Sequence, residues 1–242
     1  MTVGTIRYVA LTALVALTTV GCTRLTNEGS KSSATRPATQ LTGPMRWEAE
    51  IAKFEAADNE KMPEKNGIVF VGSSTIRMWD VNRSFPALGI IHRGFGGSQT
   101  SDMAYFARRI VTKYQPRLVV TYEGDNDIGD GKTPEQVVAD YKRFADTLHQ
   151  DVPAAKLMIL GIKPSIRRWS KIGAMREANK LLRNMAERSD WITFVDTEPM
   201  MLDEHGQPRK ELFKADCLHM NDEGYKLWSD KIRPLLTADV TK

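Results

Sequence analysis

The chain has 242 residues, of which 41% are hydrophobic and 26% are charged, a composition typical of a globular protein. It excludes a disordered or collagen-like chain, and two cysteines, Cys22 and Cys217, are too few for a disulfide framework or a zinc cluster. Lys and Arg number 34 against 30 Asp and Glu, and the net charge of +4 is spread along the chain without a basic run. We therefore expect no nucleic-acid partner.

The amino terminus is typical of an export signal. Residues 1–21 carry one charge, Arg7, before an apolar run that is too short to cross a bilayer comfortably but fits the central region of a signal peptide. Small residues then lead to Cys22, as at the lipidation site of a bacterial lipoprotein, although the usual Leu three residues earlier is Thr19 here. We expect an exported protein of the bacterial cell envelope, held at the membrane only by a lipid on Cys22. The alternative is a plain secretory signal.

A segment rich in Ser and Thr follows, over residues 22–43. It almost lacks large apolar side chains, so it cannot bury enough surface to offset the entropy lost on ordering. We expect a flexible tether here, followed by one globular domain over residues 44–242, because about 200 residues can enclose one good core.

Within that domain, short apolar runs alternate with segments of helical period. The predicted strands are 67–71, 89–92, 117–122, 156–162 and 191–195. The predicted helices are 45–61, 101–114, 134–150, 171–188 and 221–236. This alternation predicts an α/β fold of three layers, in which helices cover both faces of a five-stranded parallel sheet. In such a sheet, the working residues lie on loops beyond the carboxyl ends of the strands.

Four segments close to those loops combine glycines with polar side chains. They are Gly72-Ser73-Ser74, Gly94-Phe95-Gly96-Gly97-Ser98, Gly124-Asp125-Asn126-Asp127 and Asp216-Cys217-Leu218-His219. Together they supply a hydroxyl nucleophile, accessible backbone N–H groups, a side-chain amide and an Asp/His pair. A serine acyl hydrolase needs these groups.

In order and spacing, the four segments resemble the blocks of the SGNH or GDSL-type esterase and lipase family, which is named after its Ser, Gly, Asn and His. The resemblance covers most of residues 67–236 and is to the branch that includes platelet-activating-factor acetylhydrolases and lysophospholipases. It implies a flavodoxin-like sheet, the SGNH hydrolase fold. It also implies that Ser74 is the nucleophile, His219 the base and Asp216 the residue that orients His219, with no cofactor and no metal. The family's Gly-Asp-Ser reads Gly-Ser-Ser here, which leaves Ser73 beside the predicted nucleophile.

The same resemblance implies an oxyanion hole formed by the backbone N–H groups of Ser74 and Gly97 and the side-chain amide of Asn126. Gly96 takes the place of Gly97 if the register shifts by one residue. We expect Ser74 to follow a strand and open a helix, so that its backbone N–H can point at a developing oxyanion. Alternatively, Ser73 or Ser74 merely caps that helix, because Ser is a favoured N-cap residue. Asn126 is alternatively a turn residue in an acidic run that suggests calcium, although the run lacks the ligand pattern of an EF-hand loop.

For function, we expect hydrolysis of short, acetyl-type esters of a polar alcohol such as a carbohydrate or a lipid headgroup. After the fourth strand, a loop carries Arg167, Arg168 and Trp169, a flat ring beside charged donors that suits a sugar or a headgroup. Alternatively, Trp169 packs on the next helix and both arginines are solvated. The other candidate functions are a lysophospholipase, lipase or thioesterase for longer acyl chains, and a catalytically silent glycan-binding envelope lipoprotein. Nothing in the sequence indicates the oligomeric state.

Overall fold

The computed structural model describes residue 1 and residues 42–238. The predicted signal peptide, Cys22 and the tether up to residue 41 lie outside the described residues, so they stay predictions. Within residues 42–238, no helix has the length and apolar character needed to cross a membrane.

Five parallel strands form a single sheet, which confirms the predicted α/β fold. They are β1 (Ile68–Gly72), β2 (Ile91–Gly94), β3 (Leu118–Tyr122), β4 (Lys156–Leu160) and β5 (Ile192–Val195). Their order is β2-β1-β3-β4-β5, with every neighbouring pair parallel. β2 pairs with one edge of β1, and β3, the next strand in the chain, pairs with the other edge. This change of direction creates a topological switch point between β1 and β3. Ligands of open α/β sheets bind beyond the carboxyl ends of the strands at such a point.

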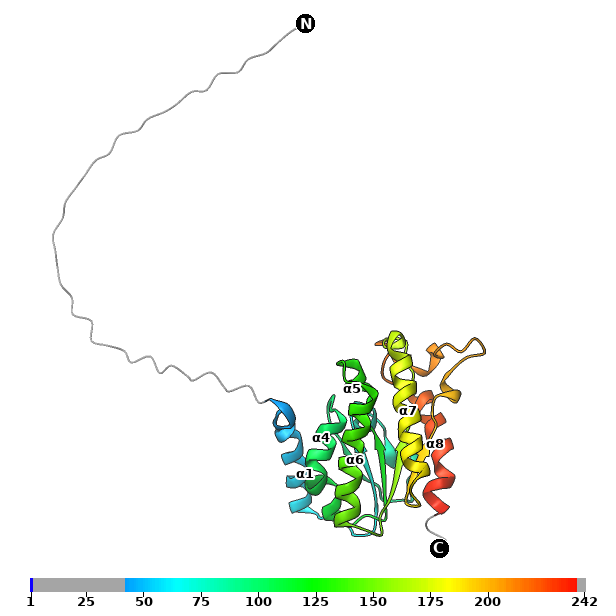
Figure 1. The fold of residues 1–242 in the computed structure, drawn as a ribbon. Coiled ribbons are helices and arrows are strands. Elements are labelled where there is room, and N and C mark those ends of the chain that lie inside the picture. The colour runs from blue at the N-terminus through cyan, green and yellow to red at the C-terminus, as the bar shows by residue number, and fades with distance from the viewer. Residues whose placement is uncertain (2–41, 239–242) are drawn as a thin grey trace, which may run out of the picture. The chain divides into compact units, whose positions relative to one another are not determined.

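Helices cover both faces of the sheet. The long ones are α1 (Glu48–Glu60), α4 (Thr100–Ile110), α6 (Pro134–Asp151), α7 (Ile172–Glu187) and α8 (Asp222–Ala238). Successive strand residues point to opposite faces, so Val69 belongs to the core beneath α1, α4, α6 and α7, whereas Phe70 belongs to the core beneath α8. Figure 1 shows the first four of these helices side by side along one face.

Three short helices lie between the strands. They are α2 (Ser74–Arg77), which follows β1 directly, α3 (Val81–Ser84), which follows α2, and α5 (Asp125–Gly129), which follows β3 directly. The sequence predicted that a helix opens at Ser74, but it predicted no helix at α3 or α5. Each spans about one turn, which is too short for a hydrophobic period to appear. The remaining short elements are 3₁₀ turns: η1 (Gly43–Trp47), η2 (Thr112–Tyr114), η3 (Trp169–Lys171), η4 (Pro199–Met201) and η5 (Lys210–Leu212).

The second strand was predicted two residues too early, at 89–92. Gly89 has a φ of +56°, so it belongs to a turn, and the strand begins at Ile91 and continues to Gly94. Gly94 pairs with Gly72 at the end of β1, which brings the loops that carry Ser74 and Gly97 together at the carboxyl edge.

Candidate active site

Ser74, His219 and Asp216 form a continuous chain of hydrogen bonds. Ser74 Oγ lies 2.9 Å from His219 Nε2, and His219 Nδ1 lies 2.6 Å from Asp216 Oδ2. With Nδ1–H donating to the carboxylate, Nε2 is left free to accept a proton from the hydroxyl. The structure thus brings together the three side chains expected to act as nucleophile, base and orienting residue.

Ser74 is the first residue of α2, directly after β1. Ser73 occupies the N-cap position, but its side chain makes no capping hydrogen bond and is buried, whereas Ser74 is only half-buried. The helix-cap alternative is therefore not what the structure shows for either serine. The hydroxyl that meets His219 is that of Ser74.

Asp216 and His219 lie on a tight turn before α8. Cys217 adopts a φ of +58° within it, and Asp216 Oδ1 accepts the backbone N–H groups of Leu218 and His219 at 3.0 and 2.9 Å. Burial raises the pKa of Asp216, but its hydrogen bonds from His219 and the two backbone N–H groups outweigh this effect and hold the pKa well below the usual range. Asp216 thus remains a carboxylate at every pH at which histidine titrates. The Cys217 side chain is half-buried, and its Sγ contacts the Ala215 carbonyl at 3.7 Å.

The predicted oxyanion donors are two backbone N–H groups and one side-chain amide, on the segments that follow β1, β2 and β3 at the carboxyl edge of the sheet. Within residues 42–238, the N–H groups of Ser74 and Gly97 donate to no other protein atom. Gly97 is exposed, and a Cβ placed on it would lie 3.8 Å from Asn126 Nδ2, so these two donors are neighbours. Gly96 instead has a φ of +39°, and its backbone packs against the Trp47 ring. An ideal Cβ on Gly96 would lie only 2.0 Å from an atom of that ring. Gly97, not Gly96, is thus the glycine beside Asn126.

Comparison with known proteins identifies the family of the chain. A model of the GDSL-like lipase/acylhydrolase family matches residues 76–227, more than half of the chain. The chain belongs to this family. It is accordingly a hydrolase of ester bonds, and its fold is the SGNH hydrolase fold.

Individual relatives are distant. Human platelet-activating factor acetylhydrolase IB subunit alpha1 is 24% identical over 208 residues, which cover 83% of this chain and 87% of the relative. A GDSL-like lipase from Bacteroides thetaiotaomicron superimposes with a TM-score of 0.70 at 18% identity, over 79% of this chain and 98% of that one. A carbohydrate esterase of family 3 from Talaromyces cellulolyticus has a TM-score of 0.60 at 17% identity, over 72% and 98%. At these identities the solved structures show the fold alone.

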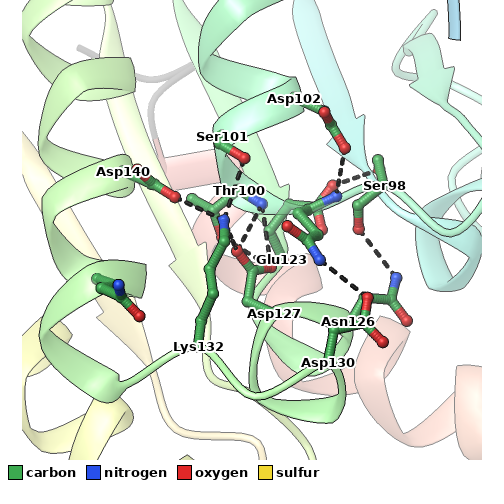
Figure 2. A network of polar contacts seen from close by, with 12 residues as sticks. Ser98, Thr100, Ser101, Asp102, Glu123, Asn126, Asp127, Asp130, Lys132 and Asp140 are labelled. Atoms are coloured by element: carbon green, nitrogen blue, oxygen red, sulfur yellow. Dashed lines mark hydrogen bonds and ion pairs between the residues drawn. The ribbon is translucent and has the colours of Figure 1, made fainter. Parts of the chain in front are cut away.

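In this GDSL-family chain, α5 joins Asn126, the predicted oxyanion donor, to the start of α4. Asn126 Nδ2 donates to the Ser98 carbonyl at 2.9 Å, and the Asp127 carboxylate accepts the Thr100 backbone N–H at 3.0 Å (Figure 2). Lys132 Nζ lies 2.8 Å from Asp127 Oδ1 and forms an ion pair with this carboxylate. The Asp127 carboxylate is thus engaged by an N–H group and a cation. Within residues 42–238, no group of three His, Cys, Asp or Glu residues could hold a metal ion.

Glu123 is a fully buried carboxyl directly behind this loop. Its Oε1 lies 2.6 Å from Ser98 Oγ, which also lies 3.0 Å from the Phe95 carbonyl. Burial, followed by the charge of Asp127, raises the pKa of Glu123 well above its usual value. A hydroxyl has one hydrogen to donate, so a protonated Glu123 can donate to Ser98 while Ser98 donates to Phe95. This arrangement fixes the loop whose carbonyl accepts from Asn126.

Sequence reasoning missed a cationic cluster beside Asn126. Arg168 was predicted to be solvated or to face substrate, yet its side chain contacts Asp125 at 2.5 Å and Asn126 Oδ1 at 3.1 Å. Lys163 is completely buried and lies 3.2 Å from the same Asp125 carboxylate. The sequence held one signal for this cluster, because Lys163 directly follows an apolar strand. A lysine buried at that place needs an anionic partner, since a charge is rarely buried without one.

Trp169 packs on the next helix, as the alternative prediction had it. Its ring lies 5.7 Å from the guanidinium of Arg176 on α7, and the side chain is half-buried. Of the two arginines before it, only Arg167 is exposed. The ring and the two arginines therefore do not form the combined face expected for a sugar.

Proposed function

We propose that the chain is a serine esterase that works through an acyl-enzyme, with Ser74 as nucleophile, His219 as base and Asp216 as the residue that orients the imidazole. The observation that carries this proposal is the continuous chain of contacts at 2.9 and 2.6 Å from hydroxyl to imidazole to carboxylate. The same contacts argue against a catalytically silent glycan-binding protein, which needs no such alignment.

The reaction has two steps. His219 accepts the Ser74 proton while Ser74 Oγ attacks the ester carbonyl, and the resulting oxyanion accepts hydrogen bonds from the Ser74 N–H, the Gly97 N–H and the Asn126 amide. Collapse of this intermediate breaks the ester bond, and His219 donates its proton to the leaving alcohol. Water, deprotonated by His219, then attacks the acyl-enzyme in the same way and releases the acid.

For substrate, we propose an acetyl or other short acyl ester on a polar alcohol, a carbohydrate or a lipid headgroup. The human relative is named as an acetylhydrolase and the Talaromyces neighbour as a carbohydrate esterase. Longer-chain lipase, lysophospholipase or thioesterase activity is the alternative.

Acyl length separates these substrates. With nitrophenyl acetate, butyrate, octanoate and dodecanoate, we expect kcat/KM to be highest for acetate or butyrate, since a short acyl group needs no long apolar groove. Steady-state rates on purified residues 44–242 measure this directly. A maximum at octanoate or dodecanoate contradicts the short-acyl proposal and favours a lipid substrate.

Activity should fall as the solution becomes acidic. A protonated imidazole cannot accept the Ser74 proton, and Asp216, whose pKa is held below its usual range, stays charged throughout. We expect kcat/KM for nitrophenyl acetate to rise from acidic to neutral pH, because only a neutral imidazole can act as the base. A flat profile over that interval contradicts a histidine base.

We further propose that the protein is exported and lipidated on Cys22. The support is the sequence pattern before Cys22, an apolar run followed by small residues. In a bacterial host, the Cys22→Ala precursor should lose labelling by a fatty-acid analogue and move from the membrane to the soluble fraction. Wild-type protein that is exported but not labelled identifies a plain secretory signal instead.

A further inference from the structure

We propose that Arg168 is a positioning residue for the oxyanion hole: its guanidinium fixes and polarises the Asn126 amide that stabilises the oxyanion. This inference rests on the proposed function, because it assigns Arg168 a role only through Asn126. Neither the family resemblance nor the expected sugar-binding face assigns this role to Arg168.

The chemistry of the neighbours decides how the amide is oriented. Arg168 has only donors and lies 3.1 Å from Asn126 Oδ1, whereas the Ser98 carbonyl is only an acceptor and lies 2.9 Å from Asn126 Nδ2. A flipped amide would set donor against donor and acceptor against acceptor. One Nδ2 hydrogen is used by Ser98, which leaves the second for an oxyanion, beside the N–H of Gly97.

Electrostatics adds to the orientation. Arg168 and Lys163 are two cations that share one carboxylate, Asp125. Burial alone would raise the pKa of Asp125, but Lys163 and Arg168 outweigh burial and lower it, so the carboxylate is ionised and the cluster keeps one net positive charge. A guanidinium at the amide oxygen draws electron density from Nδ2–H and strengthens it as a donor to developing negative charge.

The surroundings hold Arg168 in this place. Gly129 at the end of α5 leaves room for the guanidinium: an ideal Cβ there would lie 2.9 Å from Arg168 Cζ. The loop of Arg168 is also tied to the turn of the predicted base, because Lys163 Nζ donates to the Leu218 carbonyl at 2.9 Å and the Arg167 N–H to the Cys217 carbonyl at 3.0 Å. One loop thus contacts both the amide and the segment that carries His219.

The test compares steady-state hydrolysis of nitrophenyl acetate by wild type, Arg168→Met and Arg168→Lys. For Arg168→Met we expect kcat to fall by about 10- to 100-fold with KM changed by less than about 3-fold, less than for loss of the donor itself. Lys should recover part of kcat, because it keeps the charge but not the fork that spans Asp125 and Asn126. The control is Arg108→Met, which removes an arginine–carboxylate pair between the C-terminal ends of α4 and α6 and should leave kcat unchanged.

A second pair of variants avoids removing a buried charge partner. Gly129→Ala adds only a methyl group that displaces the Arg168 guanidinium, and we expect kcat to fall by about 3- to 10-fold. Gly173→Ala on α7 is its control, because nothing lies within 4 Å of the added methyl group. Thermal unfolding followed by circular dichroism identifies any variant that fails to fold. If Arg168→Met does not fold, the test rests on the comparison of Gly129→Ala with Gly173→Ala.

A double mutant separates positioning from general damage. In an Asn126→Ala background, Arg168→Met should lower kcat by less than about 2-fold, since the amide through which Arg168 acts is absent. Multiplicative losses in the double mutant, or full kcat in Arg168→Met, overturn the inference. Failure of the proposed function gives a different result, because Ser74→Ala then retains turnover whatever the Arg168 variants do.

Discussion

Replacing Ser74 with Ala is expected to lower kcat/KM for ester hydrolysis by about a thousandfold or more, the loss typical of an acyl-enzyme nucleophile. The hydroxyl contributes little to the fold, because its one side-chain partner is His219 at 2.9 Å. We therefore expect the free energy of unfolding to change by no more than about 1 kcal/mol. Steady-state kinetics with nitrophenyl acetate, together with urea unfolding, measures both quantities.

Ser73→Ala is the matched control, one residue away. Ser73 is buried at the N-cap of α2 without a capping hydrogen bond, so its removal should leave activity within a few-fold of wild type. If Ser73→Ala abolishes turnover while Ser74→Ala retains it, the nucleophile has been assigned to the wrong serine.

The second large effect is expected at Asn126. Asn126→Ala removes the side-chain donor beside Gly97, and we expect kcat to fall by about 10²- to 10³-fold. KM should change much less, because the oxyanion exists in the transition state and not in the bound ester. Nitrophenyl acetate kinetics separates the two parameters.

Asn184→Ala on α7 is the control for this variant, an asparagine of the groove between α6 and α7. It should leave both kinetic parameters unchanged. An unaltered kcat in Asn126→Ala excludes Asn126 from the oxyanion hole, whereas a rise in KM alone assigns it to ground-state binding.

The strands and long helices were predictable because their patterns are strong. A run such as residues 68–72 is buried on both faces, so it is apolar throughout, and the helices are long enough for a period to show. A helix that opens at Ser74 was predicted from the position of this serine after a strand, but the short extent of α2 was not, and α5, which carries Asn126, was not predicted as a helix. Their form depends on contacts at the sheet edge, since one turn carries no period.

At the site, sequence patterns named the residues but not their packing. The sequence left Gly96 and Gly97 as alternative donors, and the difference between them arises from Trp47, about fifty residues earlier in the chain, which packs on Gly96. Arg168 was predicted to face solvent or substrate, because its partners Asp125 and Asn126 lie on a different strand-end loop. Such contacts between distant segments leave no local pattern in the sequence.

Covalent trapping of the nucleophile tests the central claim most directly. After incubation with diisopropyl fluorophosphate, trypsin should release residues 66–77 as one peptide that contains both Ser73 and Ser74. Fragmentation by tandem mass spectrometry should place the phosphoryl group on Ser74, and the label should be lost in His219→Ala because the hydroxyl is no longer activated. A phosphoryl group on Ser73, or an active wild-type enzyme that takes up no label on this peptide, would contradict the assignment of Ser74 as the nucleophile.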